Sequence, residues 1–245
     1  MTSQFWLLRM VCEEPRAVAE AEDYERVVCP QEPHGHMRRG KRIGALNVQM
    51  SPLDVEDFVW TWGLELLVSQ RVLDIFDKHR VTGFEAKPVK VSYDGSREER
   101  PPELFELVVV GWGGVAAAAA RPKLVSWCPH CHHKRYTIAE PSRLIDPKQW
   151  DGSDLFMVWP LPGYRFVSDR LADILRREQA SGVRLIPASE LPMKRGGDAS
   201  PGQLRYFMPA DRARELDEQF GLLNWLVGPR SVGLLTWLFG TRQGR

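Results

Sequence analysis

The chain repeats part of itself, and this repeat restricts its fold more than any other feature. Residues 68–89 (VSQRVLDIFDKHRVTGFEAKPV) align without a gap with residues 167–188 (VSDRLADILRREQASGVRLIPA), at an offset of 99. Seven of the 22 positions are identical, and most of the others pair similar residues. A chain of 245 residues is long enough for one large domain or two small ones. We interpret the match as an internal duplication.

Both copies carry the pattern of a helix followed by a strand. Ser69 and Ser168 stand where a side-chain oxygen would cap a helix. Apolar residues follow at spacings of three and four, on one helix face: Val72, Ile75 and Phe76 in the first copy, and Leu171, Ile174 and Leu175 in the second. Gly83 and Gly182 suit the left-handed residue that ends a helix. The short extended runs after them each contain a proline, which favours an edge strand.

The similarity continues upstream of the two helices. DFVWTWG (57–63) resembles DLFMVWP (154–160) with a two-residue slip. Cys29 lies 99 positions before Cys128, although two compensating slips are needed to extend the alignment that far. We predict an α+β protein in which two related helix–glycine–strand repeats, residues 1–100 and 101–192, share a mixed sheet within one compact domain.

Residues 193–245 lie beyond the repeats, and we predict a helical C-terminal extension there. The apolar run 220–240 is interrupted by Gly228-Pro229-Arg230, and proline is favourable only in the first turn of a helix. This predicts two short helices with a corner between them.

Other strands and turns follow from local patterns. Phe5–Val11 and Leu104–Val110 are predicted strands, and GWGG at 111–114 is a predicted turn after the second of these. The tryptophans in strand-like contexts are predicted core residues: Trp60, Trp62 and Trp159.

One segment, SWCPHCHHKRY at 126–136, carries a dense group of metal-binding residue types. A Cys-x-x-Cys knuckle supplies two of the four ligands that tetrahedral zinc needs. The first repeat offers Cys29 together with His34 or His36, and His34 aligns with His133. We therefore predict a structural zinc site, closed across the two copies. Its predicted ligands are Cys29, His34, Cys128 and Cys131.

Three other interpretations of this segment stay open. In the first interpretation, the knuckle has lost its metal, since Glu32 stands where the second copy has Cys131. Alternatively, it is an exposed loop without a role. The third interpretation is a redox dithiol, but the residues after Cys131 have the pattern of a strand, whereas a thioredoxin-like motif opens a helix.

Composition and motifs argue against several classes of protein. The formal net charge is +1, so there is no general attraction to nucleic acid. The chain contains no H-E-x-x-H, G-x-S-x-G or P-loop motif, and we predict that it is not an enzyme. The N-terminal apolar run is short and carries Arg9, unlike a signal peptide, so we expect a cytoplasmic protein without a membrane partner.

Four segments of the chain carry a pattern shared with a known family. They are CP at 29–30, PPELFELVVV at 101–110, CPHC at 128–131, and the run from DLFMVW to ASELP over 154–192. In order and spacing they resemble the double-CXXCG-motif family of myxobacterial proteins, over residues 24–192. The chain departs from that pattern at Glu32, in place of the second cysteine of the first motif, and at His132, in place of the usual glycine.

The resemblance implies a function. Members of that family include immunity proteins, which protect a cell from a toxin delivered by its siblings. By this resemblance, the chain would be a non-enzymatic immunity protein that binds and neutralises a cognate protein toxin. If the toxin is a nuclease, an acidic surface is expected, and Glu20, Glu22 and Asp23 are the candidate partner-binding residues.

The alternative function is a zinc-ribbon-like nucleic-acid-binding module. Residues 132–136 (HHKRY) place basic side chains beside an aromatic ring, which suits a phosphate backbone and a stacked base. The patch is small and the chain is nearly neutral, so a nucleic-acid partner is the less favoured prediction.

Overall fold

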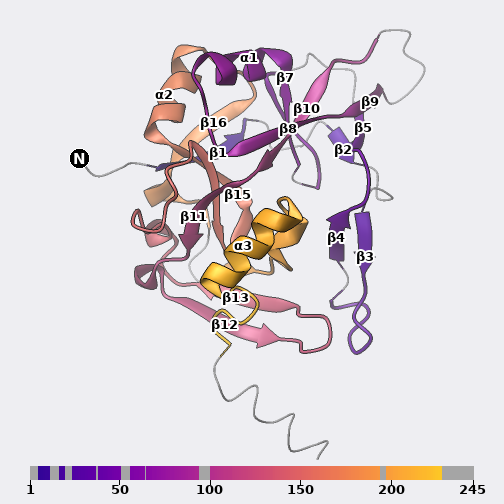
Figure 1. Ribbon diagram of the computed structural model, residues 1–245, viewed down its shortest axis with the longest axis vertical. Coiled ribbons are helices and arrows are strands. Elements are labelled where there is room, and N and C mark those ends of the chain that lie inside the picture. Colours follow the sequence, from indigo (N-terminus) through magenta and orange to yellow (C-terminus); the bar gives the residue numbers. More distant parts are fainter. Residues whose placement is uncertain are drawn as a thin grey trace, which may run out of the picture.

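Two sheets of related strand order form the centre of the fold (Figure 1). The computed structural model describes residues 5–11, 17–19, 24–36, 38–50, 56–63, 65–93, 100–193 and 197–227. One sheet has the order β11 (Gly111–Val115), β14 (Leu155–Trp159), β15 (Leu161–Ser168), β1 (Phe5–Met10) and β16 (Val183–Pro187). The other has the order β6 (Phe58–Trp60), β7 (Leu66–Ser69), β10 (Leu104–Val109) and β8 (Phe84–Pro88). Strands β11 and β14 are parallel and the other pairs of these two sheets are antiparallel, and the fold is α+β with mixed sheets.

The residue pairs between strands in one sheet correspond to those in the other. Phe5 of β1 lies opposite Ser168, and Leu104 of β10 lies opposite Ser69, which is the same pair shifted by 99 positions. The pairs that join β1 to β16 and β10 to β8 are shifted by the same number. Strands β1 and β10 therefore occupy equivalent central places in their sheets.

Each central strand comes from the opposite half of the sequence. Strand β1 belongs to the first half but completes a sheet made of residues 111–187, and β10 completes the sheet made of residues 58–88. A central strand has both of its edges hydrogen-bonded, so neither sheet is complete without the other half. The main core is continuous across the halves accordingly, since it contains Leu7 and Val72 together with Phe166.

The two predicted edge strands are confirmed. Strands β8 and β16 each lie at the end of a sheet, and each ends at a proline, Pro88 and Pro187. A proline lacks the amide hydrogen that an interior strand would donate, so an edge is where it costs least.

The two predicted helices are also present, as α1 (Gln70–Lys78) and α2 (Asp169–Arg177). Their apolar faces are buried as expected. The hydroxyl of Ser168 accepts a hydrogen bond from the amide of Leu171 (3.2 Å), which confirms this cap. Ser69 makes no side-chain cap, and its hydroxyl donates to Asp57 instead (3.1 Å).

The prediction that Gly83 and Gly182 end these helices is wrong. The left-handed residues after the helices are Arg80 and Gln179, with φ of 49° and 53°. Gly83 and Gly182 lie further along, also at positive φ. A Cβ atom at Gly83 would lie 2.0 Å from the carbonyl oxygen of Leu155, and one at Gly182 would lie 2.2 Å from that of Phe58. The glycines are needed because the two halves approach each other there through their backbones.

Two buried aspartates hold these approaches together. Each accepts hydrogen bonds from the serine that precedes α1 or α2 in its own half, from an arginine of that helix and from a backbone amide of the opposite half. These sets are Asp57 with Ser69, Ser181 and Arg71, and Asp154 with Ser168, Thr82 and Arg170. Buried carboxylates are stable only when their lone pairs are satisfied in this way.

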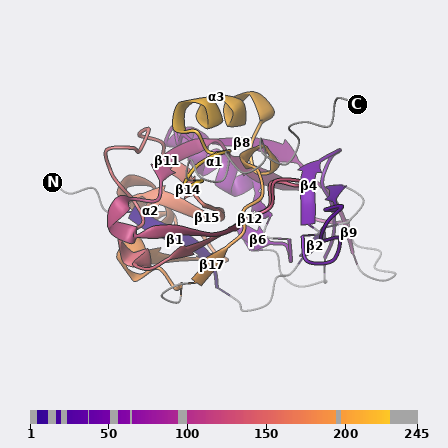
Figure 2. The same ribbon diagram turned by 90° about the horizontal axis from the view of Figure 1, so that it is seen from below.

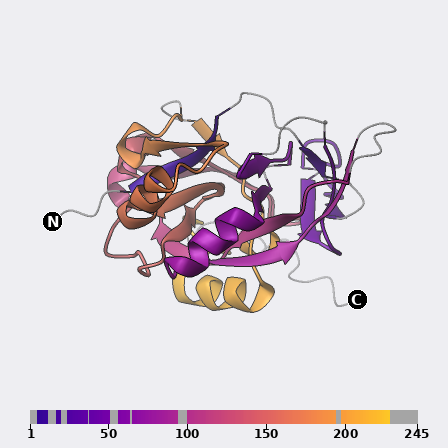
Figure 3. The same ribbon diagram turned by 90° about the horizontal axis from the view of Figure 1, so that it is seen from above.

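The contacts follow an approximate two-fold axis. Arg71 donates to the carbonyl oxygen of Glu178, and Arg170 donates to that of His79, the residue 99 positions before Glu178. In a two-fold interface each contact occurs twice with the roles exchanged. The equivalent residues His79 and Glu178 meet each other, with 2.9 Å between Nε2 and Oε1. Figure 3 shows the molecule from this α1/α2 end.

Two hairpins project at the end away from α1 and α2 (Figure 1). One consists of β3 (Tyr24–Val27) and β4 (Arg38–Arg42), and the other of β12 (Pro122–Trp127) and β13 (Lys134–Ile138). Strand β17 (Gly197–Ala199) pairs with β13. A further small sheet of β2 (Ala17–Ala19), β5 (Asn47–Met50) and β9 (Lys90–Tyr93) contributes to a second apolar cluster, which consists of residues of the first half together with Leu104 of β10.

Helix α3 (Ala210–Phe220) lies along one flank of the molecule (Figure 2). It buries Ala213 and Leu216 and ends at Gly221, which is left-handed with φ of 61°. Residues 221–226 form turns, so the first of the two helices predicted in 220–240 is absent there. The second falls on 228–245, outside the described residues.

Two further predictions are corrected. The GWGG segment is not a turn but the buried strand β11, where a Cβ at Gly113 would lie 2.5 Å from the ring of Phe156. Trp60 and Trp159 are core residues, but Trp62 is 63% exposed because it follows the end of β6.

Short 3-10 helices occupy Ala118–Ala120, Pro141–Arg143, Ala188–Glu190 and Leu204–Tyr206.

Within the described residues, we find no helix with the length and apolar character needed to cross a membrane.

Candidate metal centre

The tips of the two hairpins bring together four side chains of metal-binding type. Cys29 follows β3, and His36 lies in the turn that leads to β4. Cys128 and Cys131 lie in the turn between β12 and β13. One ligand atom from each of the four lies within 4.8 Å of the others. Each half of the sequence therefore contributes two ligands to a cluster that can bind a metal ion.

Two separations within the cluster are close to those around a small tetrahedral ion. The sulfur atoms of Cys29 and Cys128 are 3.7 Å apart, and Cys131 Sγ is 3.7 Å from His36 Nδ1. Zinc binds sulfur at about 2.3 Å and imidazole nitrogen at about 2.0 Å, so tetrahedral angles place two sulfurs about 3.8 Å apart and a sulfur and a nitrogen about 3.5 Å apart. Three thiolates and one imidazole are also a donor set typical of zinc.

Local backbone geometry shapes the second knuckle. The amide of Cys128 donates to the carbonyl oxygen of His133 (2.8 Å), which closes the turn. His132 has φ of 54°, a conformation that favours glycine. Histidine is one of the residues better tolerated there.

The first hairpin builds its tip differently. The amide of His36 donates to the carbonyl oxygen of Glu32 (3.0 Å), and this turn carries His36 toward the cysteines. The ring of His36 stacks on that of His133, with 4.3 Å between centroids and 12° between planes. His133 thus supports a ligand from the opposite half without itself belonging to the four.

The ligand atoms are largely shielded from solvent. Cys29 is fully buried, Cys128 is nearly so, and Cys131 and His36 are partly exposed. Burial opposes ionisation of Cys29, but hydrogen bonds from His36 and from the backbone near Glu32 outweigh it and lower the pKa of this thiol to about 6. Burial raises the pKa of Cys131. A thiolate is the form that binds a metal.

Three of the four predicted ligands lie in the cluster, and the fourth does not. His34 is exposed and lies outside it, and His36 takes its place. The alignment had matched His34 with His133, and neither is among the four residues. The two histidines of His34-Gly35-His36 differ only in their distance from β4. No local sequence pattern therefore predicts which of the two is the ligand. The predicted partner-binding residues Glu20, Glu22 and Asp23 lie outside the described residues.

Two of the five residues in the segment of the nucleic-acid alternative, Lys134 and Tyr136, are buried, whereas His132 and Arg135 are exposed. Lys134 is 2% exposed and donates to the carbonyl oxygens of Leu222 (3.0 Å) and Leu223, and burial lowers its pKa to about 8. Tyr136 is fully buried against Trp225. Neither side chain is placed to contact a phosphate backbone or a base.

Comparisons with known proteins identify no relatives. No protein-family model matches the chain, and no curated protein that was compared with it is significantly similar.

Proposed function

We propose that this chain is a non-enzymatic immunity protein, which binds a cognate protein toxin in the cytoplasm and neutralises it. In this proposal, two copies of a repeated unit, offset by 99 residues, are held together by a structural zinc ion. The observation that supports the zinc ion is the cluster of Cys29, His36, Cys128 and Cys131, and the toxin-binding role rests on the resemblance of four sequence segments to a family that includes immunity proteins. Four protein ligands fill a tetrahedral shell and leave no position for a substrate, which is the pattern of structural rather than catalytic zinc.

The proposed duplication is supported by the shared register. A pairing such as Phe5 with Ser168 and its equivalent, Leu104 with Ser69, preserves one offset across two sheets. The offset equals that between Cys29 and Cys128, which lie 3.7 Å apart. Residues 1–100 and 101–192 would then be the two copies, and residues 193–245 an added extension that contributes α3.

A metal at the hairpin tips would connect the halves at the end away from α1 and α2. The free energy of metal binding adds to folding stability when the unfolded chain has no preformed site. A rigid scaffold loses less conformational entropy when a partner binds. Zinc would thus serve recognition indirectly, by fixing the positions of the hairpins.

An exposed aromatic side chain supports the binding role. Trp62 is 63% exposed, and its amide donates to the carbonyl oxygen of Ala17 (3.0 Å), beside the exposed Val18 of β2. Ile43, after β4, is 71% exposed. Tryptophan is among the residues that most often dominate the energy of protein interfaces. We propose Trp62 as an anchor for the toxin, with Glu20, Glu22 and Asp23 supplying charge complementarity that speeds association.

The experiment is a capture followed by a toxicity assay. The tagged, zinc-loaded chain is used to isolate proteins from the cells that produce it, with washes at moderate and high salt. A captured protein is then expressed alone and together with the chain in a host that lacks both. We expect the captured protein to stop growth when expressed alone, and growth to recover when the chain is present.

Variants make the result specific. Trp62→Ala is expected to weaken capture and protection, and Val125→Ala, at an exposed apolar residue of β12, is the matched control. Charge reversal at Glu20, Glu22 and Asp23 tests the acidic residues separately. A captured protein that is harmless, or whose toxicity the chain leaves unchanged, contradicts the proposal.

A further inference from the structure

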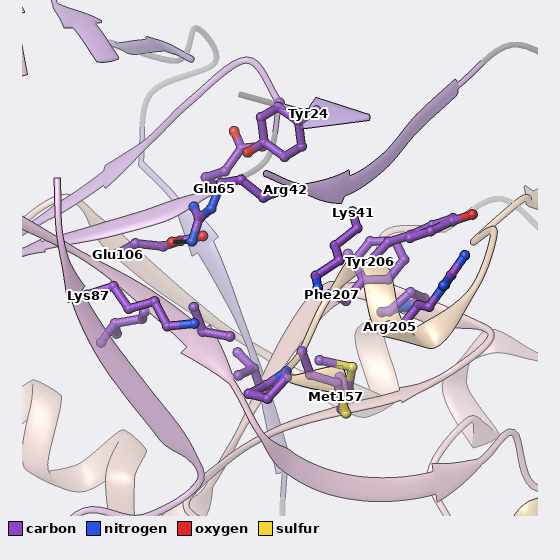
Figure 4. A pocket seen from close by; sticks show the side chains of 18 of the residues that line it. Tyr24, Lys41, Arg42, Glu65, Lys87, Glu106, Met157, Arg205, Tyr206 and Phe207 are labelled. Atoms are coloured by element: carbon purple, nitrogen blue, oxygen red, sulfur yellow. Dashed lines mark hydrogen bonds and ion pairs between the residues drawn. The ribbon is translucent and has the colours of Figure 1, made fainter. Parts of the chain in front are cut away.

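A charged cleft lies between the β3–β4 hairpin and the segment that leads into α3 (Figure 4). Parts of β8, β10 and β15 form its other walls, so residues of both halves line it. Its volume is about 360 Å³. Small-molecule sites have volumes of roughly 300–1,000 Å³, so the cleft is large enough for a small organic ligand.

Positive charge exceeds negative charge in this cleft. The cationic side chains are Lys41, Arg42, Lys87, Arg165 and Arg205, and the carboxylates are Glu65 and Glu106. Arg42 forms an ion pair with Glu106, and Glu65 accepts a hydrogen bond from Tyr24 (2.7 Å). Figure 4 shows Lys41 and Arg205 on one side of the opening and Arg42 and Lys87 on the other. An anion between them would meet cations from two directions.

The guanidinium of Arg165 is the least satisfied of these groups. It donates to the carbonyl oxygen of Gly163 (2.6 Å), but its Nε is buried without a hydrogen-bond partner among the described residues. Nη1 of Arg42 is also buried without a hydrogen-bond partner among the described residues. Burial lowers the pKa of Arg165, against the opposing charges of Glu65 and Glu106, and no carboxylate of the described chain forms an ion pair with it. A partly buried cation without a directly paired anion is costly, and a bound anion would reduce that cost.

Helix α3 adds a second feature that favours an anion. It begins at Ala210 in the wall of the cleft, and its N-cap residue, Pro209, has no side-chain oxygen to satisfy the first amides. Free amides at a helix N-terminus attract negative charge. Met157 and Phe207 also line the cleft and provide apolar surface beside the charged groups.

We propose that this cleft binds a small molecule that carries a phosphate group and an apolar portion. A phosphate monoester has a charge of about −1.5 to −2 at neutral pH, which matches the excess of cations better than a single carboxylate does. Arginine also donates to phosphate oxygens with two parallel hydrogen bonds. This inference does not depend on the proposed toxin.

The test is a calorimetric titration of the full-length, zinc-loaded chain with phenyl phosphate. Inorganic phosphate tests the charged group without the apolar part, and phthalate tests a dicarboxylate of similar charge and shape. We expect saturable binding of phenyl phosphate that is tighter than that of either comparator. Binding should weaken as salt concentration rises, because the attraction is electrostatic.

Variants separate a binding role from a structural one. Arg165→Met is expected to weaken the binding of phenyl phosphate by about tenfold or more, the effect of losing a charge-assisted hydrogen bond. The melting temperature of the free variant should be unchanged or higher, because an unpaired buried charge has been removed. Lys87→Met is a second variant at a more exposed position. Arg143→Met, exposed and outside the cleft, is the control.

Several outcomes would overturn the inference. One is the absence of saturable binding of phenyl phosphate, and another is unchanged affinity in both Arg165→Met and Lys87→Met. Tighter binding of phthalate than of phenyl phosphate would assign a dicarboxylate ligand instead. Loss of toxin capture in Arg165→Met, without any binding of phenyl phosphate to the wild type, would assign the cleft to the protein interface.

Discussion

The two ends of the approximate two-fold axis are built on different principles. At the α1/α2 end, the hydrogen bonds around Asp57 in one half have counterparts around Asp154 in the other. At the hairpin end the halves differ, since the second supplies Cys128 and Cys131 and the first supplies Cys29 and His36.

The difference follows from what each end must satisfy. At the α1/α2 end the donors of each half face backbone carbonyl oxygens and an aspartate carboxylate of the opposite half, so a change in one half leaves a buried group of the other unsatisfied. A metal ion needs only four suitable donor atoms around one point. The first half therefore tolerates Glu32 in place of a cysteine, because His36 reaches the same point from another position in the turn.

The largest expected effect is loss of the metal. Cys128→Ser should reduce bound zinc from one equivalent to a small fraction. It should also lower the free energy of unfolding by about 4 kcal/mol, the stabilisation by a ligand at 1,000 times its Kd. Metal analysis and denaturant unfolding, with and without a chelator, measure both effects. His34→Ala is the control, because His34 is exposed and outside the cluster. Equal zinc content in Cys128→Ser and the wild type would contradict the assignment.

Substitutions at the close backbone approaches between the halves should have the next largest effect on stability. Gly83→Ala and Gly182→Ala each place a Cβ within 2.2 Å of a carbonyl oxygen in the opposite half, and we expect each to lower the free energy of unfolding by about 3 kcal/mol. Gly152→Ala is a matched control, since its φ is also positive at 88° but its Cβ would meet nothing within 4 Å. It should cost about 1 kcal/mol. Similar losses in all three variants would show that backbone conformation, and not the contact between halves, explains them.

The aspartates test the symmetry directly. Asp57→Asn and Asp154→Asn each remove an ion pair and replace one acceptor oxygen with an NH2 group, a donor that faces other donors, at a cost of about 2 kcal/mol. The two variants should be equal within experimental error and should keep a single unfolding transition, because the halves share a core. Two separate transitions in either variant would argue that the halves fold independently.

The smallest expected effect concerns His79 and Glu178, the equivalent residues that contact each other. Hydrogen bonds from Lys78 and His79 lower the pKa of Glu178 from 4.5 to about 2. The folded state therefore favours the ionised carboxylate, and this stabilisation is present above pH 4.5 and is lost as the pH falls toward 2. The melting temperature of the wild type should fall more steeply over this range than that of Glu178→Gln. Glu190→Gln, at an exposed glutamate, should follow the wild type. Parallel curves for all three proteins would remove any role for this pair.

Local patterns predicted a large part of the fold. The spacing of apolar residues identified the buried faces of α1 and α2, and the prolines identified β8 and β16 as edge strands. Such predictions succeed because the interactions involved lie within a few residues of one another. The glycines were found but given the wrong role, since the atoms that exclude a side chain at Gly83 belong to Leu155.

The sequence by itself determined that the chain contains two similar helix–strand units and that Cys29, Cys128 and Cys131 are of metal-binding type. Only the tertiary structure decided that β1 and β10 exchange sheets and that His36, rather than His34, joins the cysteines. Backbone hydrogen bonds between strands carry little sequence information, so the partner of β1 is chosen by burial against residues about 160 positions away. The ligand is likewise chosen by where the hairpin turn places a ring, and that depends on contacts with the opposite half.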